Sequence, residues 1–238
     1  LYMIGAFVVL SLLPWLPPAK PVPAAVVNLE NCNGCTRCVE DCPFGALTMV
    51  PRSDGRGYDA EPVVNENNCT SCGICAGSCP TSTPFRRAGP LKPGIELPQQ
   101  PIAALRDALV ATRDKVTNGK HVSVFACDTS DTSTLPDSGT SIIKMPCVGM
   151  LPPSFIDFAL SRHYADGVMI SGCAEGDCHH RLGNEWTRRR MARERDPYLR
   201  RRVDERRLAL SWLPRGDRKR RTRSLAEFHD ALQELADE

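Results

Sequence analysis

The chain has 238 residues, which is enough for one large domain or two small ones and excludes a larger set of domains. Its composition is ordinary except for twelve cysteines, a number that needs an explanation of its own. The formal net charge of +2 conceals a basic end, because residues 181–223 hold 17 Lys and Arg against 6 Asp and Glu. The rest of the chain is therefore acidic on balance.

Two runs of four cysteines share one spacing: Cys32, Cys35, Cys38 and Cys42 before Pro43, and Cys69, Cys72, Cys75 and Cys79 before Pro80. The spacing C-x2-C-x2-C-x3-C-P is that of bacterial ferredoxins, where thiolates hold [4Fe–4S] clusters. Three thiolates two residues apart wrap round one cubane, whereas the fourth lies one helical turn on and reaches the other cluster. We therefore expect crossed ligation, with Cys32, Cys35, Cys38 and Cys79 on one cluster and Cys69, Cys72, Cys75 and Cys42 on the second.

A disulfide framework and a zinc site are the alternatives for these cysteines. Zinc favours two separated C-x2-C pairs, and disulfides do not require two identical registers. Residues 27–88 resemble the two-cluster bacterial ferredoxin family, which implies a small α+β domain. Short strands are expected at 46–50 and 62–64, with a connecting loop at 51–61.

The second half of the chain alternates strands with helices, which predicts a small α/β domain with a Rossmann-like parallel sheet. Apolar runs at 122–126, 141–145 and 167–171 end at Cys127, Cys147 and Cys173. Because ligands of open α/β sheets bind beyond the carboxyl ends of the strands, these thiols should converge there. Helices are expected at 102–116, 153–164, 182–195 and 224–238.

Cys178 completes a second candidate site with the three cysteines at the strand ends. The spacing Cys173-x4-Cys178 is also used by plant-type [2Fe–2S] proteins, so one [2Fe–2S] cluster on Cys127, Cys147, Cys173 and Cys178 is predicted. Four buried structural thiols or a zinc site are the alternatives. Rieske-like ligation by His179 and His180 is disfavoured because the Rieske spacing differs, and packing beside the cluster is expected instead.

The segments MPCVGMLPPSFIDFAL (145–160) and GVMISGCAEGDCHHRLGN (167–184) resemble the methyl-viologen-reducing hydrogenase delta-subunit family. The resemblance covers about residues 119–212. It implies a [2Fe–2S] cluster and docking to hydrogenase-like or heterodisulfide-reductase-like partners. One departure is that Ser130 stands where the family has the second cysteine of a C-x-x-C pair.

Residues 1–19 carry no charge and are predicted to be the end of a transmembrane helix, with a buried core helix as the alternative. A stiff Pro-rich linker at 20–26 would then lead into the ferredoxin domain. Because clusters are inserted where thiols stay reduced, the domains should lie on the cytoplasmic side of the membrane. Residues 89–118, between the two domains, are expected to be a linker and a helix. Residues 213–238, after the second domain, are expected to be a basic tail and a C-terminal helix.

The Arg-rich segment 187–223 has two main interpretations. It could be a solvated helical face, or it could dock to an acidic partner or to anionic headgroups. Nucleic-acid binding is disfavoured because no aromatic interleaving or recognised module accompanies the charge. An iron–sulfur sensor bound to nucleic acid would depend on this segment alone.

Three cluster sites favour an electron-transfer subunit without catalysis of its own, since no Gly-rich phosphate loop and no Ser/His/Asp constellation is evident. We expect it in a membrane-associated oxidoreductase complex with hydrogenase- or heterodisulfide-reductase-like subunits, a cytochrome-type membrane subunit being a further candidate. The competing class is a catalytic subunit that reduces a small disulfide with the region of Cys147, Cys173 and Cys178. Four ligands on one cluster leave no spare thiol, which disfavours it.

Overall fold

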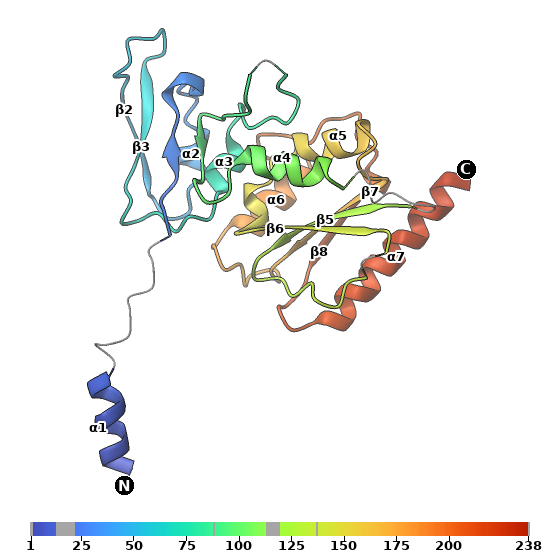
Figure 1. Cartoon of the computed structure of the whole chain (residues 1–238). Helices are drawn as coiled ribbons and strands as arrows, with labels where there is room; N and C mark the ends of the chain where they lie inside the picture. The colour runs from blue at the N-terminus through green and yellow to red at the C-terminus, as the bar shows by residue number, and fades with distance from the viewer. Residues whose placement is uncertain (1, 13–21, 88, 113–119, 137, 238) are drawn as a thin grey trace.

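The computed structural model describes residues 2–12, 22–87, 89–112, 120–136 and 138–237. A small cysteine-rich part comes first in the chain and lies against one side of a larger α/β part (Figure 1). The C-terminal helix lies on the side of the α/β part that faces away from the smaller part (Figure 1).

The cysteine-rich part contains two short antiparallel sheets. Strand β2 (Leu47–Pro51) pairs with β3 (Ala60–Val64), close to the predicted strands, with Leu47 opposite Val64. Strand β1 (Val26–Val27) pairs with β4 (Ile95–Glu96). The short helices of this part are η2 (Leu29–Asn31), α2 (Arg37–Glu40) and α3 (Ile74–Ser78).

The two cysteine loops repeat one backbone conformation 37 residues apart. Gly34 and Thr36 have positive φ in the first loop, and Ser71 and Gly73 have positive φ at the equivalent places in the second. Gly34 is required, because a Cβ there would lie 2.5 Å from the carbonyl oxygen of Ala60. The loops thus enter α2 and α3 in the same way, and each helix carries the third cysteine of its run.

The segment expected to be a linker packs into the interior. Leu91, Ile95 and Leu97 are fully buried, and they belong to the same apolar core as residues of the α/β part. Strand β4 lies within this segment and returns to the start of the cysteine-rich part. The two parts therefore share one core.

The α/β part has a four-stranded parallel sheet in the order β6-β5-β7-β8, which confirms the predicted parallel sheet. Three strands agree with the apolar runs of the sequence: β5 (Val122–Cys127), β6 (Thr140–Met145) and β7 (Gly167–Gly172). The edge strand β8 (Leu208–Trp212) was not predicted, although its sequence LALSW is apolar at four of its five positions.

Helices cover both faces of this sheet. Helix α7 (Arg218–Asp237) packs Leu225, Phe228 and Leu232 against Val122, Val124 and Met169. The opposite face carries Phe125 and is covered by the shared core. Alternate residues of a strand point to opposite faces, which explains this division. The elements on the second face are α4 (Ile102–Val110), η4 (Val148–Met150), α5 (Ser154–Ser161) and α6 (Gly183–Met191), and η5 (Glu205–Arg207) precedes β8.

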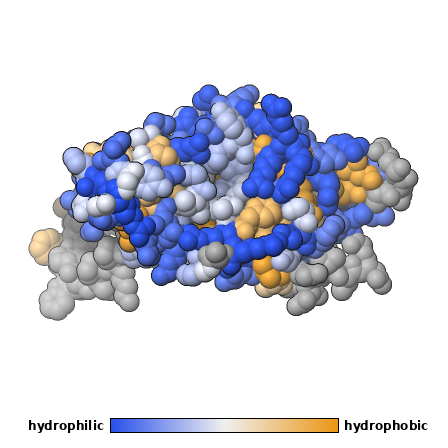
Figure 2. Space-filling model, turned by 90° about the horizontal axis from the view of Figure 1, so that it is seen from above, coloured by the Kyte–Doolittle hydropathy of each residue, from blue (hydrophilic) through white to orange (hydrophobic). Residues whose placement is uncertain are grey.

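The basic segment is more internal than the sequence suggests. Arg190 and Arg221 have no exposed surface at all, and Asp157, itself buried, accepts hydrogen bonds from Arg200 and Arg202. Arg190 and Arg221 are therefore internal, whereas Arg200 and Arg202 pair with Asp157 from the surface, with side chains 47% and 58% exposed. The face seen in Figure 2 is still largely hydrophilic, with apolar side chains in small separate patches.

The apolar N-terminal run forms helix α1 (Tyr2–Leu12), whose side chains, including Tyr2 and Phe7, are exposed where they are described. Within the described ranges, no helix combines the length and the apolar character needed to cross a bilayer. Residues 13–21, which include the end of the predicted membrane segment and the start of the predicted linker at 20–26, lie outside the described residues.

Candidate metal centres

The first cavity lies beneath α2 and is surrounded by four thiols. Its lining includes Gly34, Pro62 and Ile95 in addition to the thiols of Cys32, Cys35, Cys38 and Cys79. The first three come from one loop and its helix, whereas Cys79 follows α3, 37 residues further along than Cys42. The structure therefore brings together the four cysteines that crossed ligation requires.

A second cavity holds the complementary set of thiols, Cys42, Cys69, Cys72 and Cys75. Its remaining lining is mostly apolar and includes Phe44, Leu47, Val64 and Leu97. The two cavities are neighbours, because α2 contacts α3 and the thiols of Cys75 and Cys38 are close enough to interact electrostatically.

Hydrogen-bond donors point at several of these sulfur atoms. The backbone N–H of Ala25 donates to Cys69 Sγ at 3.5 Å, and that of Ala46 donates to Cys42 Sγ at 3.4 Å. The Thr81 hydroxyl lies 3.1 Å from Cys79 Sγ. Such donors stabilise a thiolate and the sulfur of a metal–thiolate bond.

Burial and neighbouring thiols raise the pKa of two thiols at the centre of these sites. Burial raises the pKa of Cys38 to about 12, and the nearby Cys79 adds to the effect. Burial, reinforced by Cys72 and Cys38, also raises the pKa of Cys75 well above its usual value. A metal bound at these sites would compensate the charge of the thiolates, since a coordinating thiol is deprotonated by the metal it binds.

A third group of thiols lies where the strands of the parallel sheet end. Cys127 contacts Cys147 and Cys173, and Cys178 contacts the same two, so the four thiols form a ring. Cys127 and Cys147 are 2% and 1% exposed, whereas Cys173 and Cys178 are partly exposed. The predicted convergence at the carboxyl ends of the strands is therefore present.

Hydrogen-bond donors and a close helix approach surround the sulfur atoms of this ring. The backbone N–H of Val148 donates to Cys127 Sγ at 3.2 Å, and the Thr129 hydroxyl lies 3.3 Å from Cys173 Sγ. Gly183 lets α6 approach, because a Cβ at this position would lie 2.1 Å from Cys147 Sγ. Hydrogen bonds with Cys127 and Cys178, together with burial, raise the pKa of Cys147, whereas those same two thiols lower the pKa of Cys173.

The three sets of thiols have two features in common. In each set the thiols surround a space or form a ring, and they come with N–H or O–H donors to sulfur. In the part of the chain that the structure describes, no group of three or more Cys, His, Asp or Glu has the geometry to hold a single metal ion.

His179 and His180 pack beside the third group. Their rings are 4.7 Å apart, and the ring of His180 meets Phe44 of the cysteine-rich part edge-on at 6.4 Å. Burial lowers the pKa of His180, and His179 lowers it further. Ser130, which stands in place of a family cysteine, is buried and donates a hydrogen bond to the carbonyl of Ser171.

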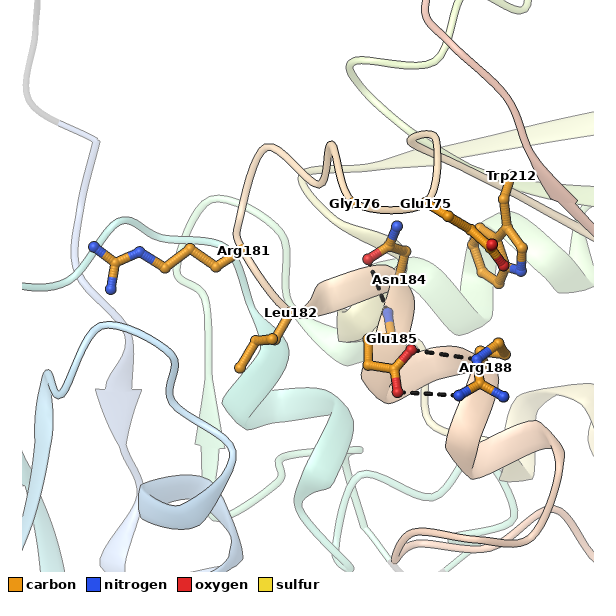
Figure 3. Close-up of a pocket in the computed structure, with 8 residues that line it drawn as sticks. All are labelled: Glu175, Gly176, Arg181, Leu182, Asn184, Glu185, Arg188 and Trp212. Atoms are coloured by element: carbon orange, nitrogen blue, oxygen red, sulfur yellow. Dashed lines mark hydrogen bonds and ion pairs between the residues drawn. The ribbon is translucent and has the colours of Figure 1, made fainter.

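Two openings lie near the Cys173–Cys178 loop, and one of them reaches Cys173. One of about 190 Å³ is lined by Thr129, Cys173 and His179, among others. The other has about 520 Å³ and is drawn in Figure 3, where Glu185 pairs with Arg188 on α6 while Glu175 and Trp212 lie across from them.

A short line of contacts joins the second cavity to the third group. Ile74 precedes Cys75 on α3, and its side chain lies against Gly149 and Gly183. Gly183 in turn adjoins Cys147 Sγ. The three candidate sites therefore form a row through the shared core.

The sequence did not point to the polar residues that join the two parts. Asp41 accepts hydrogen bonds from Arg190 and Arg195 of the α/β part, and its backbone carbonyl accepts one from the Trp186 ring. Arg181 donates to the carbonyl of Pro43 at 2.8 Å. The residues are more than 130 positions apart, so no local pattern could have paired them.

Comparison with known proteins assigns both parts. Residues 31–83 match a 4Fe-4S dicluster domain, which defines the chain as an iron–sulfur protein. Residues 120–236 match the delta subunit of methyl-viologen-reducing hydrogenase. The chain belongs to this delta-subunit family and carries the dicluster domain in front of the family's domain.

Named relatives agree with this assignment. An iron-sulfur subunit of the F420-non-reducing hydrogenase of Archaeoglobus profundus is 30% identical over 94 residues, which is 40% of this chain and 68% of that protein. The corresponding iron-sulfur subunit of the vhc F420-non-reducing hydrogenase of Methanococcus voltae is 51% identical over 51 residues, 21% of this chain and 35% of that protein.

A third relative aligns with both parts of the chain. It is one of the subunits of the ferredoxin:CoB-CoM heterodisulfide reductase of Methanosarcina mazei, and it is 31% identical over 220 residues. These residues make up 89% of this chain but only 25% of the relative. The same pair of parts thus occurs within a much longer protein.

Proposed function

We propose that the chain is an electron-transfer subunit that relays electrons through two [4Fe–4S] clusters and one [2Fe–2S] cluster between other redox subunits. The ligands of the first cubane are Cys32, Cys35, Cys38 and Cys79, and those of the second are Cys42, Cys69, Cys72 and Cys75. The ligands of the [2Fe–2S] cluster are Cys127, Cys147, Cys173 and Cys178.

The observation that carries this proposal is the row of three thiol groups through one core. Cys38 and Cys75 lie close enough to interact, and Ile74, beside Cys75, adjoins Gly183, which adjoins Cys147. Redox centres that each adjoin the next are the arrangement that an electron relay requires.

The exposure of the thiols supports a relay that is open at both ends. Cys35 of the first group is exposed, and Cys173 and Cys178 of the third are partly exposed. Cys72 and Cys75 of the middle group are buried. Cys42 and Cys69 of the same group are partly exposed. A redox partner can therefore approach either end of the relay.

The relatives support hydrogenase or heterodisulfide-reductase complexes as the setting. Their names describe iron-sulfur subunits of hydrogenases and one component of a heterodisulfide reductase. We infer that one partner docks over the partly exposed Cys173–Cys178 loop, beside the two openings described above. Association with a membrane through α1 stays a prediction, as does a cytochrome-type partner.

Metal analysis under anaerobic conditions tests the proposal. Two cubanes and one [2Fe–2S] centre require about ten irons per chain, with matching acid-labile sulfide and distinct EPR signals. The variant Cys147→Ser should keep about eight irons and both cubane signals while losing the [2Fe–2S] signal. Eight irons in the wild-type chain, with no [2Fe–2S] signal, would refute the third centre.

A further inference from the structure

A buried ion pair connects the two parts beside the second and third candidate sites. Asp41 follows α2 and is 4% exposed, and Arg190 of α6 is fully buried. The guanidinium of Arg190 bonds to the Asp41 carboxylate, and its other arm donates to the carbonyl of Gly149 at 2.9 Å. Arg190 therefore joins three segments: the end of α2, helix α6 and η4.

Further contacts hold the Asp41 side chain in place. Arg195 donates to its other carboxylate oxygen at 2.8 Å, and the Arg195 guanidinium lies 3.6 Å from the centre of the Trp186 ring. The Trp186 ring nitrogen donates to the Asp41 carbonyl at 3.3 Å. A carboxylate held by two guanidinium groups has little freedom to move.

Such a pair is poorly explained by stability alone. Burying two charges costs a desolvation free energy that the pairing often only offsets, so apolar residues of equal volume frequently stabilise a fold as well. Removing one partner is nevertheless strongly destabilising, because the other charge is left buried and unpaired. The pair therefore specifies one arrangement of the two parts more than it strengthens either.

Each member of the ion pair is close to a thiol of a candidate centre, Asp41 in the chain and Arg190 in space. Asp41 directly precedes Cys42, a thiol of the second cavity. Arg190 interacts electrostatically with Cys147 of the third group, and Gly149, whose carbonyl it binds, donates its N–H to Cys147 Sγ at 3.4 Å. Arg190 thus lies beside the third candidate centre, and Asp41 is next in the chain to a thiol of the second.

We propose that Asp41 and Arg190 are positioning residues that hold the second cluster against the third and set the difference between their potentials. The inference rests on the proposed function, in which one electron passes directly between these centres, oxidising one as it reduces the other. A negative charge beside the second centre disfavours its reduced form, and a positive charge beside the third favours its reduced form. The pair therefore favours electron residence on the third.

Redox titration followed by EPR separates this role from a purely structural one. Asp41→Asn should raise the midpoint potential of the second cluster, and Arg190→Gln should lower that of the third, because each removes a charge of opposite sign. Both variants should weaken the magnetic interaction between the two centres. Arg201→Gln, which removes an exposed charge from the same basic segment, is the matched control and should leave the potentials and the interaction unchanged.

Arg190→Lys provides a second test in case Asp41→Asn or Arg190→Gln does not fold. Lysine retains the charge but lacks the fork that reaches both Asp41 and Gly149, so the potential should be kept while the magnetic interaction weakens. Variants with full iron content and with potentials and spectra equal to those of Arg201→Gln would overturn the inference. A wild-type chain without a [2Fe–2S] signal would instead contradict the proposed function, and the shift expected at the second cluster in Asp41→Asn would still test Asp41.

Discussion

Asp41 and Cys42 are adjacent in the chain but serve different neighbours. The Asp41 side chain turns to the arginines of the α/β part, whereas Cys42 lines the second cavity with Cys69 and Cys75. Single residues at the end of α2 thus connect the two parts and complete a metal site at once. Individual side chains, rather than whole elements, decide which centre each cysteine serves.

Crossed ligation predicts the effect of replacing Cys42. Cys42→Ser should disturb the EPR signal of the cluster on Cys69, Cys72 and Cys75, with a loss of up to about four irons. Cys79→Ser is the reciprocal control and should disturb the other cubane. If Cys42→Ser damages only the cluster next to it in sequence, the ligand assignment is wrong.

Arginine side chains show a second effect of single residues. Arg221 of α7 is fully buried and donates to the Ser171 hydroxyl and to the carbonyls of Asp131 and Leu213. Its five N–H donors suit such a task, since they satisfy several backbone acceptors at a sheet edge. Part of the positive charge of the basic segment is therefore internal and inaccessible to partners.

Among the elements, α7 is attached to the sheet by an apolar face and one histidine. Leu225 and Phe228 pack on the sheet, and His229 Nε2 lies 3.2 Å from the Thr140 hydroxyl at the start of β6. Burial lowers the pKa of His229 below its ordinary value of 6.5, although Asp230 partly opposes this. The docking of α7 should therefore depend on pH.

The sign of that dependence follows from proton linkage. As the pH decreases below about 6.5, the unfolded chain binds a proton at His229 more readily than the folded chain does. The free energy of unfolding therefore falls as the pH drops from 6.5 toward the lower pKa of the folded chain. Above pH 6.5 the contribution of His229 to stability is fully present. The thermal unfolding midpoint of the wild type should fall more between pH 8 and pH 6 than that of His229→Gln, measured anaerobically. Parallel decreases in the two proteins would contradict this role.

At the scale of the whole molecule, the two parts are joined by close backbone contact as well as by the ion pair. Gly77 on α3 meets the backbone of η4, where a Cβ would lie 2.1 Å from the carbonyl oxygen of Gly149. Ile74 and Leu97 share a core with Phe125 and Phe155. The dicluster domain is thus not a separate module on a linker.

Gly77→Ala tests this packing. Helix propensity favours alanine by about 1 kcal/mol, but overpacking a close contact typically costs about 1–3 kcal/mol, and here the contact is with backbone, which yields little. We expect net destabilisation and faster proteolysis between the two parts. Gly57→Ala, in a loop where a Cβ meets nothing within 4 Å, should leave both measurements unchanged. Equal behaviour of the two variants would mean that the parts are packed loosely.

The sequence by itself determined the features that depend on local spacing. The repeated cysteine spacing, the strands ending at Cys127, Cys147 and Cys173, and the apolar face of the last helix were all readable, because loop geometry and side-chain periodicity are set within a few residues. The fourth thiol of each ferredoxin set comes from the other cysteine run, so its assignment depended on the known ferredoxin spacing rather than on local geometry.

Only the tertiary structure decided how the two parts meet. The burial of Leu97, the pairing of Asp41 with Arg190 and the edge position of β8 each depend on residues distant in the sequence. An arginine has the same intrinsic preference for water wherever it stands in the chain. Whether its charge is buried depends on which acceptors the fold brings to it, because the cost of desolvation is offset only by partners already in place.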